Sequence, residues 1–424
     1  MAKTFVFKFG GASIKDADSI KNLFNILHNR LRNHTIIVVS AMGKTTNALE
    51  KILSKKLTDE DYSLNITILK DFHLDICKQL FPSSHPIFSQ LENDFLRLQR
   101  AINKTVDKQN YDEVYDSIIC FGELIASRIV YQFLCTQGLI CLWQDAREII
   151  KTNEDFRFAL VDWQTTRQNC HNYLMPKLLQ FPVVTQGFIA MSNSGKTTTL
   201  GREGSDFSAA ILASCLQSQS VTIWKDVPGV LNADPKRFAQ TIKFDELDYR
   251  EAAELTYYGA SVIHPKTIKP LANHHIPLFV KSFLTPDDPG TKIHEVEQSQ
   301  KIPCFVVKDD QVLVSFKVTD FTFIDEGHIH QIYAELQKLK LRVNLLQISA
   351  ISISLVIEKQ VFKLEQLIEG LEADFEIRYN EGLQLVTIKN HHPKLIQEVT
   401  EKREVLLEQV TRATFQAVMT PLAQ

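Results

Sequence analysis

Lysine and glycine stand together near the start of the chain in a pattern that suits an anion. Lys8 is followed by Gly10 and Gly11. Because glycine has no side chain, backbone N–H groups at these positions can approach an anion closely while the lysine ammonium neutralises its charge. The same residues would also form an ordinary turn at the end of a strand, and this segment alone leaves both interpretations open.

A second segment, Gly201 to Asp206, carries more chemistry. Arg202 supplies a planar guanidinium that matches the geometry of a carboxylate. Ser205 is a suitable N-cap for a helix predicted over residues 206–216, and the N–H groups at the start of that helix are further donors. The alternative interpretation is a capped loop without a ligand.

Further charged residues follow a predicted apolar strand at 221–224. Lys225 and Asp226 come directly after this strand, and Asp234 and Arg237 come after the Pro-Gly turn that follows. Parallel sheets bind ligands at the carboxyl ends of their strands. These four side chains are therefore candidates for ligand binding, with a plain turn as the alternative.

Glu123 and His264 need no special function on sequence grounds alone. Glu123 lies in the first turn of a predicted helix, where the helix dipole favours a carboxylate. His264 follows the end of another predicted helix. We expect His264 to cap a helix or to lie in the core rather than to act in catalysis.

Two Gly-Lys-Thr triplets resemble the Walker A sequence, and both fail its requirements. A P-loop must enter a helix at this triplet so that the helix N-terminus faces the phosphates. The triplet at Gly195 has Ala190 in place of the first glycine of the motif and leads to Gly201 without a helix. The triplet at Gly43 has Val38 where the motif needs glycine. We expect neither segment to be a P-loop.

Composition narrows the class of protein. The 424 residues are 44% hydrophobic and 23% charged, with a formal net charge of −3, which argues against disorder and against a nucleic-acid-coating role. The 15 glycines are about half of what an average composition predicts. Seven cysteines without a Cys-x-x-Cys pair indicate buried thiols in a reducing compartment. With no apolar run of membrane-spanning length, we expect a cytoplasmic protein without a membrane span.

The order of predicted elements indicates an α/β domain. Alternating residues predict a strand at 4–9, helical spacing predicts a helix from 16 to 31, and an apolar run predicts a buried strand at 36–39. Strand, helix and strand in this order favour a mainly parallel central sheet with helices on both faces. Residues 48–180 are predicted to be mainly helical, and a strand is predicted at 183–189.

A turn cluster at Thr285 to Gly290 precedes a change in composition. We place a domain boundary just beyond it, giving a front domain at 1–297 and a second region at 298–424. The second region has the β-α-β-β-α-β order of a ferredoxin-like α+β domain over about 308–389. Residues 298–307 and 390–424, with a short helix near 393–402 and a final strand near 409–418, look like an incomplete second copy.

Six segments of the front part, in order, resemble motifs of the aspartate kinases of the amino-acid kinase family, and the tail resembles paired ACT domains, which sense end-product amino acids in that family. Each motif is weak alone, but six in one order are a strong signal. The segments are Lys-Phe-Gly-Gly-Ala-Ser from residue 8, Val-Val-Ser-Ala-Met-Gly-Lys-Thr-Thr-Asn from 38, Phe-Gly-Glu from 121, Thr-Thr-Thr-Leu-Gly-Arg-Glu-Gly-Ser-Asp from 197, Trp-Lys-Asp-Val-Pro-Gly-Val from 224 and Tyr-Tyr-Gly-Ala-Ser-Val-Ile-His-Pro from 257.

The resemblance implies the amino-acid kinase fold followed by ferredoxin-like ACT domains, and a defined reaction. The γ-phosphoryl group of ATP would pass to the side-chain carboxylate of L-aspartate, giving 4-phospho-L-aspartate and ADP at the start of lysine, threonine and methionine biosynthesis. A carboxylate with a pKa of about 4 is already ionised at neutral pH, so no general base is needed. The resemblance also implies Mg²⁺ held mainly by the nucleotide phosphates, without a metal site of the protein's own, and a homodimer formed through the ACT-like domains.

The family's roles carry over to the positions that match its motifs. Lys8 would stabilise the transferring phosphoryl group, and Asp206 would orient Lys8. Arg202 would bind a carboxylate of aspartate, and Glu123 would bind its ammonium group. The other implied positions are Ser40, Thr46 and Ser205 for the substrate and Lys8, Gly10, Gly11, Lys225, Asp226, Asp234 and Arg237 for the nucleotide.

Three positions depart from the family pattern. Glu203 stands where the family more often has glycine, so an extra anion beside Arg202 either repels the substrate or points to solvent. Ser261 occupies a position where many relatives carry a lysine that reaches the nucleotide, and Lys225 is the candidate replacement. Asn344 stands where lysine-sensing relatives commonly have aspartate, which leaves feedback inhibition by lysine or threonine open.

Two other functions stay open at this point. One is a kinase of the same fold with another acceptor, such as glutamate or acetylglutamate, against which the Phe-Gly-Glu segment and the ACT-like tail count. The other is a non-catalytic amino-acid sensor, for which Glu203 and Ser261 would be marks of decay. Intact Lys8, Arg202 and Asp206 favour the kinase. The length leaves no room for the homoserine dehydrogenase domain of bifunctional relatives, so a single activity is expected.

Overall fold

The computed structural model describes residues 3–31, 34–107, 110–238, 240–259, 263–297, 301–319, 322–360 and 362–421. The chain forms two compact units. The first comprises Met1–Val230, Lys243–Thr256 and Ser261–Ser299, and the second comprises Leu231–Ile242, Tyr257–Ala260 and Gln300–Gln424. The boundary predicted near residue 298 lies outside the described residues. Two short segments of the front part thus group with the tail.

The first unit is built on a mainly parallel sheet, as the sequence predicts. Its eight strands, in their order across the sheet, are β3 (Leu142–Gln144), β5 (Val183–Gln186), β2 (Thr35–Val39), β1 (Phe5–Phe9), β8 (Ser220–Lys225), β10 (Leu278–Ser282), β11 (Thr291–His294) and β9 (Glu246–Asp248). Neighbouring strands are parallel except β10 and β11. Every residue of β2 is buried, so helices cover both faces of the sheet.

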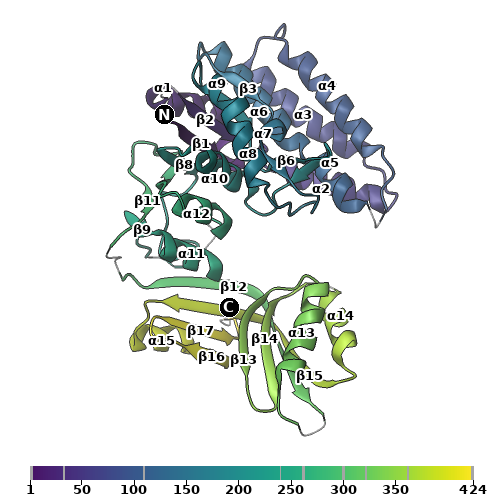
Figure 1. The fold of residues 1–424 in the computed structure, drawn as a ribbon, viewed down its shortest axis with the longest axis vertical. Coiled ribbons are helices and arrows are strands. Elements are labelled where there is room, and N and C mark those ends of the chain that lie inside the picture. Colours follow the sequence, from purple (N-terminus) through teal and green to yellow (C-terminus); the bar gives the residue numbers. More distant parts are fainter. Residues whose placement is uncertain are drawn as a thin grey trace. The chain divides into compact units, whose positions relative to one another are not determined.

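Helices pack on the two faces in different ways (Figure 1). On one face, helices α1 to α6 form a contiguous core with Phe9, Ile37 and Val39 of the sheet. On the other, α10 packs against β1 and β8. The helices of the front part are α1 (Ala17–Arg30), α2 (Thr45–Leu57), α3 (Ser63–Leu80), α4 (Ile87–Ile102), α5 (Tyr111–Ile119), α6 (Phe121–Thr136), α7 (Ala146–Ile149), α8 (Trp163–Asn169), α9 (Met175–Leu178), α10 (Gly204–Leu216), α11 (Tyr249–Tyr258) and α12 (Pro265–Ala272).

One helical run of the described chain, Tyr111–Thr136, is long and apolar enough by composition to cross a membrane. Of its most apolar window, 78% is buried inside the protein. This run comprises α5 and α6, whose apolar residues belong to the core of the first unit. The helix that contains Glu123 is therefore anchored in the interior.

The prediction of one strand over 183–189 is wrong. β5 ends at Gln186, and β6 (Ile189–Ser192) belongs to a separate sheet with β4 (Lys151–Thr152) and β7 (Thr197–Thr199). The break falls at Phe188, which has φ of 66°. Its N–H donates to Ser208 Oγ of α10 at 2.9 Å instead of to a neighbouring strand.

The second Gly-Lys-Thr triplet lies in the hairpin between β6 and β7, which pair antiparallel. A strand, not a helix, follows Gly195, and Lys196 pairs with Glu113 at 2.9 Å. The triplet therefore lacks the helix N-terminus that a P-loop needs. The prediction that this segment is not a P-loop is confirmed.

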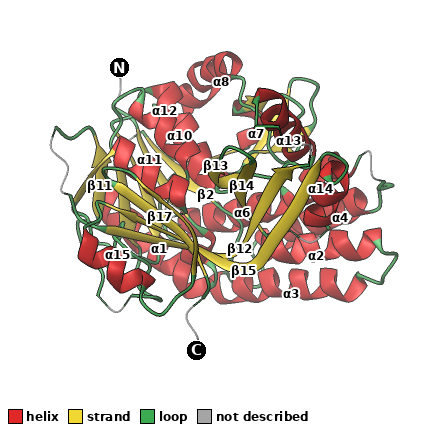
Figure 2. Ribbon diagram, turned by 90° about the horizontal axis from the view of Figure 1, so that it is seen from below, coloured by secondary structure: helices red, strands yellow, loops and turns green. Residues whose placement is uncertain are grey.

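The second unit contains an antiparallel sheet with the order β13-β14-β12-β15-β17-β16. Its elements are β12 (Cys304–Val318), α13 (Glu326–Lys338), β13 (Val343–Ile348), β14 (Ser352–Glu358), α14 (Lys363–Leu371), β15 (Phe375–Lys389), α15 (Pro393–Thr400), β16 (Val405–Val410) and β17 (Thr414–Met419). The elements from β12 to β15 have the predicted β-α-β-β-α-β order. β12 and β15 are the long strands of this sheet (Figure 2).

The last segment differs from its prediction. In place of one strand near 409–418, the chain forms two, β16 and β17, joined by a tight turn. β17 pairs with the second half of β15, which also pairs with Cys304–Lys308 of β12. A register shift after Lys308 separates this half of β12 from the other. The two halves of each long strand therefore lie in different parts of the sheet, and the incomplete second copy stays a prediction.

Candidate active site

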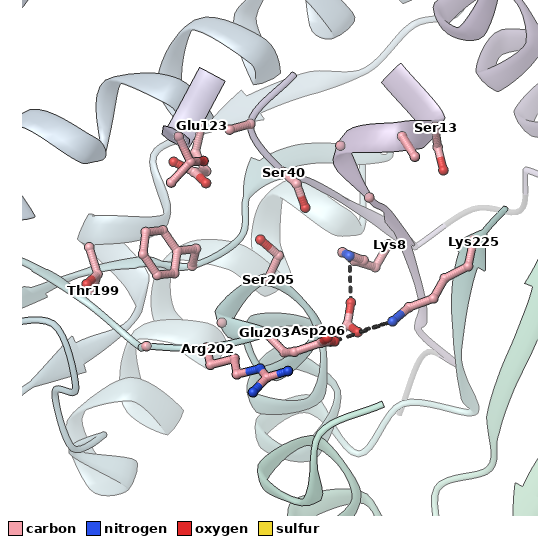
Figure 3. A pocket seen from close by; sticks show the side chains of 18 of the residues that line it. Lys8, Ser13, Ser40, Glu123, Thr199, Arg202, Glu203, Ser205, Asp206 and Lys225 are labelled. Atoms are coloured by element: carbon pink, nitrogen blue, oxygen red, sulfur yellow. Dashed lines mark hydrogen bonds and ion pairs between the residues drawn. The ribbon is translucent and has the colours of Figure 1, made fainter. Parts of the chain in front are cut away.

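A cavity of about 560 Å³ opens where β1, β2 and β8 end and where α6 and α10 begin (Figure 3). This volume is within the range of about 300–1,000 Å³ that is usual for small-molecule sites. The carboxyl ends of parallel strands meet at one edge of a sheet, which explains the location. The predicted site residues that line the cavity are Lys8, Gly10, Gly11, Ser40, Thr46, Glu123, Arg202, Ser205, Asp206, Lys225 and Asp226.

A buried carboxylate joins two lysines at one end of this cavity. Asp206 Oδ1 lies 2.6 Å from Lys8 Nζ, and Asp206 Oδ2 lies 3.2 Å from Lys225 Nζ. Asp206 is 1% exposed. Burial alone would raise the pKa of Asp206, but the two ammonium groups outweigh it and hold the pKa below its usual range. Asp206 thus stays ionised and fixes both lysines at the strand ends.

Glu203 adds a second carboxylate to this cluster. Its Oε2 lies 3.3 Å from Lys225 Nζ, so the carboxylate is directed at the lysine cluster although 26% of the side chain is exposed. Burial raises the pKa of Glu203, and Asp206 adds to the rise while Lys225 opposes it. Burial would lower the pKa of Lys225, but Asp206 and Glu203 raise it.

The start of α10 differs from the prediction. Glu203, not Ser205, occupies the N-cap position, and it does so in the left-handed conformation with φ of 56° and without a side-chain capping bond. Ser205 lies inside the first turn of the helix and lines the cavity. A Cβ atom at Gly187 would lie 2.5 Å from Cβ of Ser205. This close packing requires glycine at 187. Ser205 is not the cap, because the helix already begins at Gly204.

Glu123 is a buried carboxylate at the opposite side of the cavity (Figure 3). It is 3% exposed, and the backbone N–H of Ala41 donates to it. Its Oε2 has no hydrogen-bond partner within the described part of the chain. Burial is the main cause that raises the pKa of Glu123 to about 8. A buried carboxylate oxygen without a donor is costly, and a bound cation would remove that cost.

Ser40 and Thr46 also line the cavity. Ser40 follows β2, and its backbone N–H donates to the Phe9 carbonyl at 3.2 Å. Thr46 belongs to the first turn of α2. A Cβ atom at Gly11 would lie 2.8 Å from the Ala41 carbonyl oxygen, so glycine at this position allows the loops after β1 and β2 to touch.

The other predicted residues fall in different places. Arg202 is exposed at the rim of the cavity and Asp226 lines it. Asp234 and Arg237 belong to the second unit. There Asp234 Oδ1 accepts the N–H of Lys236 at 2.9 Å, and Arg237 pairs with Asp309. Their nucleotide-binding role stays a prediction.

Ser261 lies outside the described residues. His264 is described, and it is the N-cap residue of α12, with Nδ1 accepting the N–H of Lys266 at 3.2 Å. The expectation of a capping role for His264 is confirmed.

Sequence reasoning missed the carboxylate that holds one wall of the cavity. Asp116 is fully buried. Its Oδ2 accepts the backbone N–H of Thr199 at 2.8 Å and that of Arg157 at 2.9 Å, and its Oδ1 accepts the Thr199 hydroxyl at 2.7 Å. Burial raises the pKa of Asp116 to about 6 despite these bonds. No local motif marks Asp116, because its partners lie about 40 and 80 residues away in the sequence.

Arg157 and its neighbours form the rest of this wall and were also missed. Arg157 has φ of 68°, and its guanidinium stacks on the ring of Tyr115 at 4.4 Å. Phe158 and Thr199 line the cavity beside them. At the other end, Trp224 is 1% exposed and stacks on Phe9 with ring centroids 6.0 Å apart.

Comparison with known proteins agrees with this geometry. A model of the amino acid kinase family matches residues 3–282. The lysine-sensitive aspartokinase 3 of Escherichia coli is 29% identical over 92% of this chain and 87% of its own length. Chloroplastic aspartokinase 2 of Arabidopsis thaliana is 30% identical over 87% of this chain and 71% of its own length. The chain belongs to the amino acid kinase family, among its aspartokinases.

The fold of this family member also matches a solved structure. The match to the crystal structure of E. coli aspartokinase III in complex with aspartate and ADP has a TM-score of 0.85 and 25% sequence identity. It covers 99% of this chain and 96% of the E. coli chain.

The hydrogen bonds of Asp116 give a stability prediction. We expect Asp116→Ala to lower the free energy of unfolding of the first unit by about 2–4 kcal/mol, because the buried N–H of Thr199 and the partly buried N–H of Arg157 lose their acceptor. Asp112→Ala removes a half-exposed partner of Arg157. It should lower the free energy of unfolding by less than about 1 kcal/mol. Chemical denaturation would measure both. Equal losses for the two variants would contradict this role of Asp116.

Proposed function

We propose that this protein is an ATP-dependent aspartate kinase that converts L-aspartate to 4-phospho-L-aspartate and releases ADP. The observation that carries the proposal is that one cavity holds a lysine cluster at one side and a buried carboxyl group at the other. Lys8 and Lys225 meet Asp206 at one side, and Glu123, whose Oε2 has no hydrogen-bond partner among the described residues, lies at the other. The first group suits transferring phosphate, and Glu123 suits the ammonium group of an amino acid. The aspartokinase relatives support this assignment.

The cavity accounts for the chemistry without a general base. The ionised side-chain carboxylate of aspartate attacks the γ-phosphorus of ATP, and the bond from that phosphorus to the bridging oxygen breaks as ADP leaves. Negative charge collects on the transferring group, so a fixed cation contributes most to catalysis. Lys8, held at 2.6 Å by Asp206, is that cation. Arg202 at the rim binds a carboxylate of the substrate bidentately.

Mg²⁺ would enter this site with the nucleotide. The described residues contain no cluster of three or more His, Cys, Asp or Glu side chains that could hold a metal ion. Both oxygens of Asp206 are engaged by lysines. These observations support an ion held mainly by phosphates, with Asp226, which follows Lys225 in the chain, as a further cavity carboxylate. When bound, Mg²⁺ supplies charge neutralisation for the phosphates.

The regulatory region, assembly and location extend this proposal. The second unit supports a pair of ACT-like domains, and we propose a homodimer formed through them in the cytoplasm, acting at the start of lysine, threonine and methionine biosynthesis. At the position where lysine-sensing relatives carry aspartate, Asn344 bonds Lys308 at 2.9 Å and Gln311 at 2.8 Å. The side-chain amide of Asn344 is therefore hydrogen-bonded to other residues of the second unit.

Aspartate-dependent turnover tests the central proposal. Coupled ADP release would be measured with Mg²⁺ and ATP in the presence of L-aspartate, L-glutamate or no acceptor, and hydroxylamine would trap the acyl phosphate. We expect release and trapping with L-aspartate only. Turnover with glutamate instead would favour the alternative acceptor, and no turnover with any acceptor would favour the amino-acid sensor.

Lys8 gives a prediction about the chemical step. We expect Lys8→Ala to lower kcat by about 10²–10³-fold, while the KM for aspartate changes little, because the ammonium acts on the transferring group. Lys196→Ala removes the lysine of the Walker-like hairpin and should keep kcat within about twofold. Steady-state kinetics would measure both. The assignment of Lys8 fails if its loss changes only KM.

Glu123 gives a prediction about pH. Since its pKa is raised to about 8, its carboxyl is largely neutral in the free site at pH 6 and ionises as pH rises. An ammonium group binds the ionised form, so we expect the KM for aspartate to fall by up to about tenfold per pH unit below pH 8. Glu123→Gln should raise the KM and remove this dependence. A KM profile that keeps its slope in Glu123→Gln would contradict the assignment.

A further inference from the structure

The charges of the lysine cluster cancel in this protein. Lys8 and Lys225 contribute two positive charges, and Asp206 and Glu203 contribute two negative charges when ionised. Lys225 Nζ lies 3.2 Å from Asp206 and 3.3 Å from Glu203, so one ammonium serves both carboxylates. Without Glu203 the same cluster would carry one net positive charge toward the cavity.

The backbone shows that Glu203 is an unusual residue for its position. It adopts φ of 56° and ψ of 27° between Gly201 and Gly204. Glycine populates this left-handed region at little cost, whereas a residue with a side chain is strained there. The helix start therefore needs no glutamate at 203. The feature that glutamate adds is its carboxylate, which reaches Lys225 with only 26% of the side chain exposed.

A phosphate group that binds the two lysines meets this carboxylate. It must either displace Glu203 from Lys225 or bind against its negative charge, and both lower the affinity. We infer that Glu203 is an internal counter-ion that weakens polyphosphate binding at Lys8 and Lys225 and thereby eases nucleotide release. The inference rests on the proposed function in that the cluster receives the phosphates of ATP and ADP.

Two substitutions separate the charge of Glu203 from its backbone conformation. Glu203→Gln removes the charge and keeps a side chain at positive φ. Glu203→Gly removes the charge and also relieves the strained conformation. Glu203→Asp keeps the charge, and Glu154→Gln is a matched control, because Glu154 also contacts a lysine, Lys196 at 3.6 Å, but lies outside the cavity.

The probe is ADP with Mg²⁺, titrated calorimetrically into each full-length variant without aspartate. We expect Glu203→Gln and Glu203→Gly to bind ADP at least about tenfold more tightly than the unmodified protein, as loss of one nearby repulsive charge implies. Glu203→Asp and Glu154→Gln should bind ADP with an affinity within about threefold of that of the unmodified protein. In turnover, the KM for ATP should fall in the two charge-removing variants, and the KM for aspartate should change little.

The outcomes are distinct. Unchanged or weaker ADP binding in Glu203→Gln would overturn the inference, because it would show that Glu203 only orients Lys225. Tighter binding in Glu203→Gly alone would also overturn it, since only the backbone would then matter. Absence of aspartate-dependent turnover in the unmodified protein would overturn the proposed function but not the counter-ion role, which the ADP titration measures separately.

Discussion

The ion pairs of Asp206 are the interaction on which the rest of the site depends. A carboxylate that is 1% exposed would be strongly destabilising by itself, because burial removes its hydration. It is tolerated because Lys8 and Lys225 approach its two oxygens at 2.6 and 3.2 Å. This geometry requires β1 and β8 to be neighbours, with Phe9 opposite Trp224. It also requires α10 to begin directly beneath their ends.

The loops around the cavity must also approach one another closely, and this explains why glycine is needed at two positions. Gly187 lets the loop after β5 lie against Ser205, and Gly11 lets the loop after β1 lie against Ala41. In each case a Cβ atom would approach a neighbouring atom to less than 3 Å. These two glycines therefore lie where loops from different strands must touch to close the cavity. This gives the small number of glycines in the front part a physical meaning.

Sequence reasoning succeeded where the determining pattern is local. The apolar run of β2, the glycines after Lys8 and the charged segment before α10 predicted the parallel sheet and most of the cavity lining. It failed where distant residues decide the local structure. Phe188 breaks a strand because Ser208 of α10 accepts its N–H, and Ser205 is not a cap because α10 begins one residue earlier, at Gly204. Asp116 could not be found, because its acceptor role depends on N–H groups far away in the sequence.

The neutral lysine cluster also bears on how binding energy is used. Strong attraction between fixed cations and polyphosphate stabilises bound ATP and bound ADP alike, and uniform binding of this kind does not raise kcat. A carboxylate that competes for Lys225 reduces that shared attraction. Lys8 contacts the other oxygen of Asp206, Oδ1, at 2.6 Å, and in the proposed function it acts on the group being transferred. On the proposal made above, the arrangement lowers ground-state binding at Lys225 and preserves Lys8 as the cation that acts on the transition state.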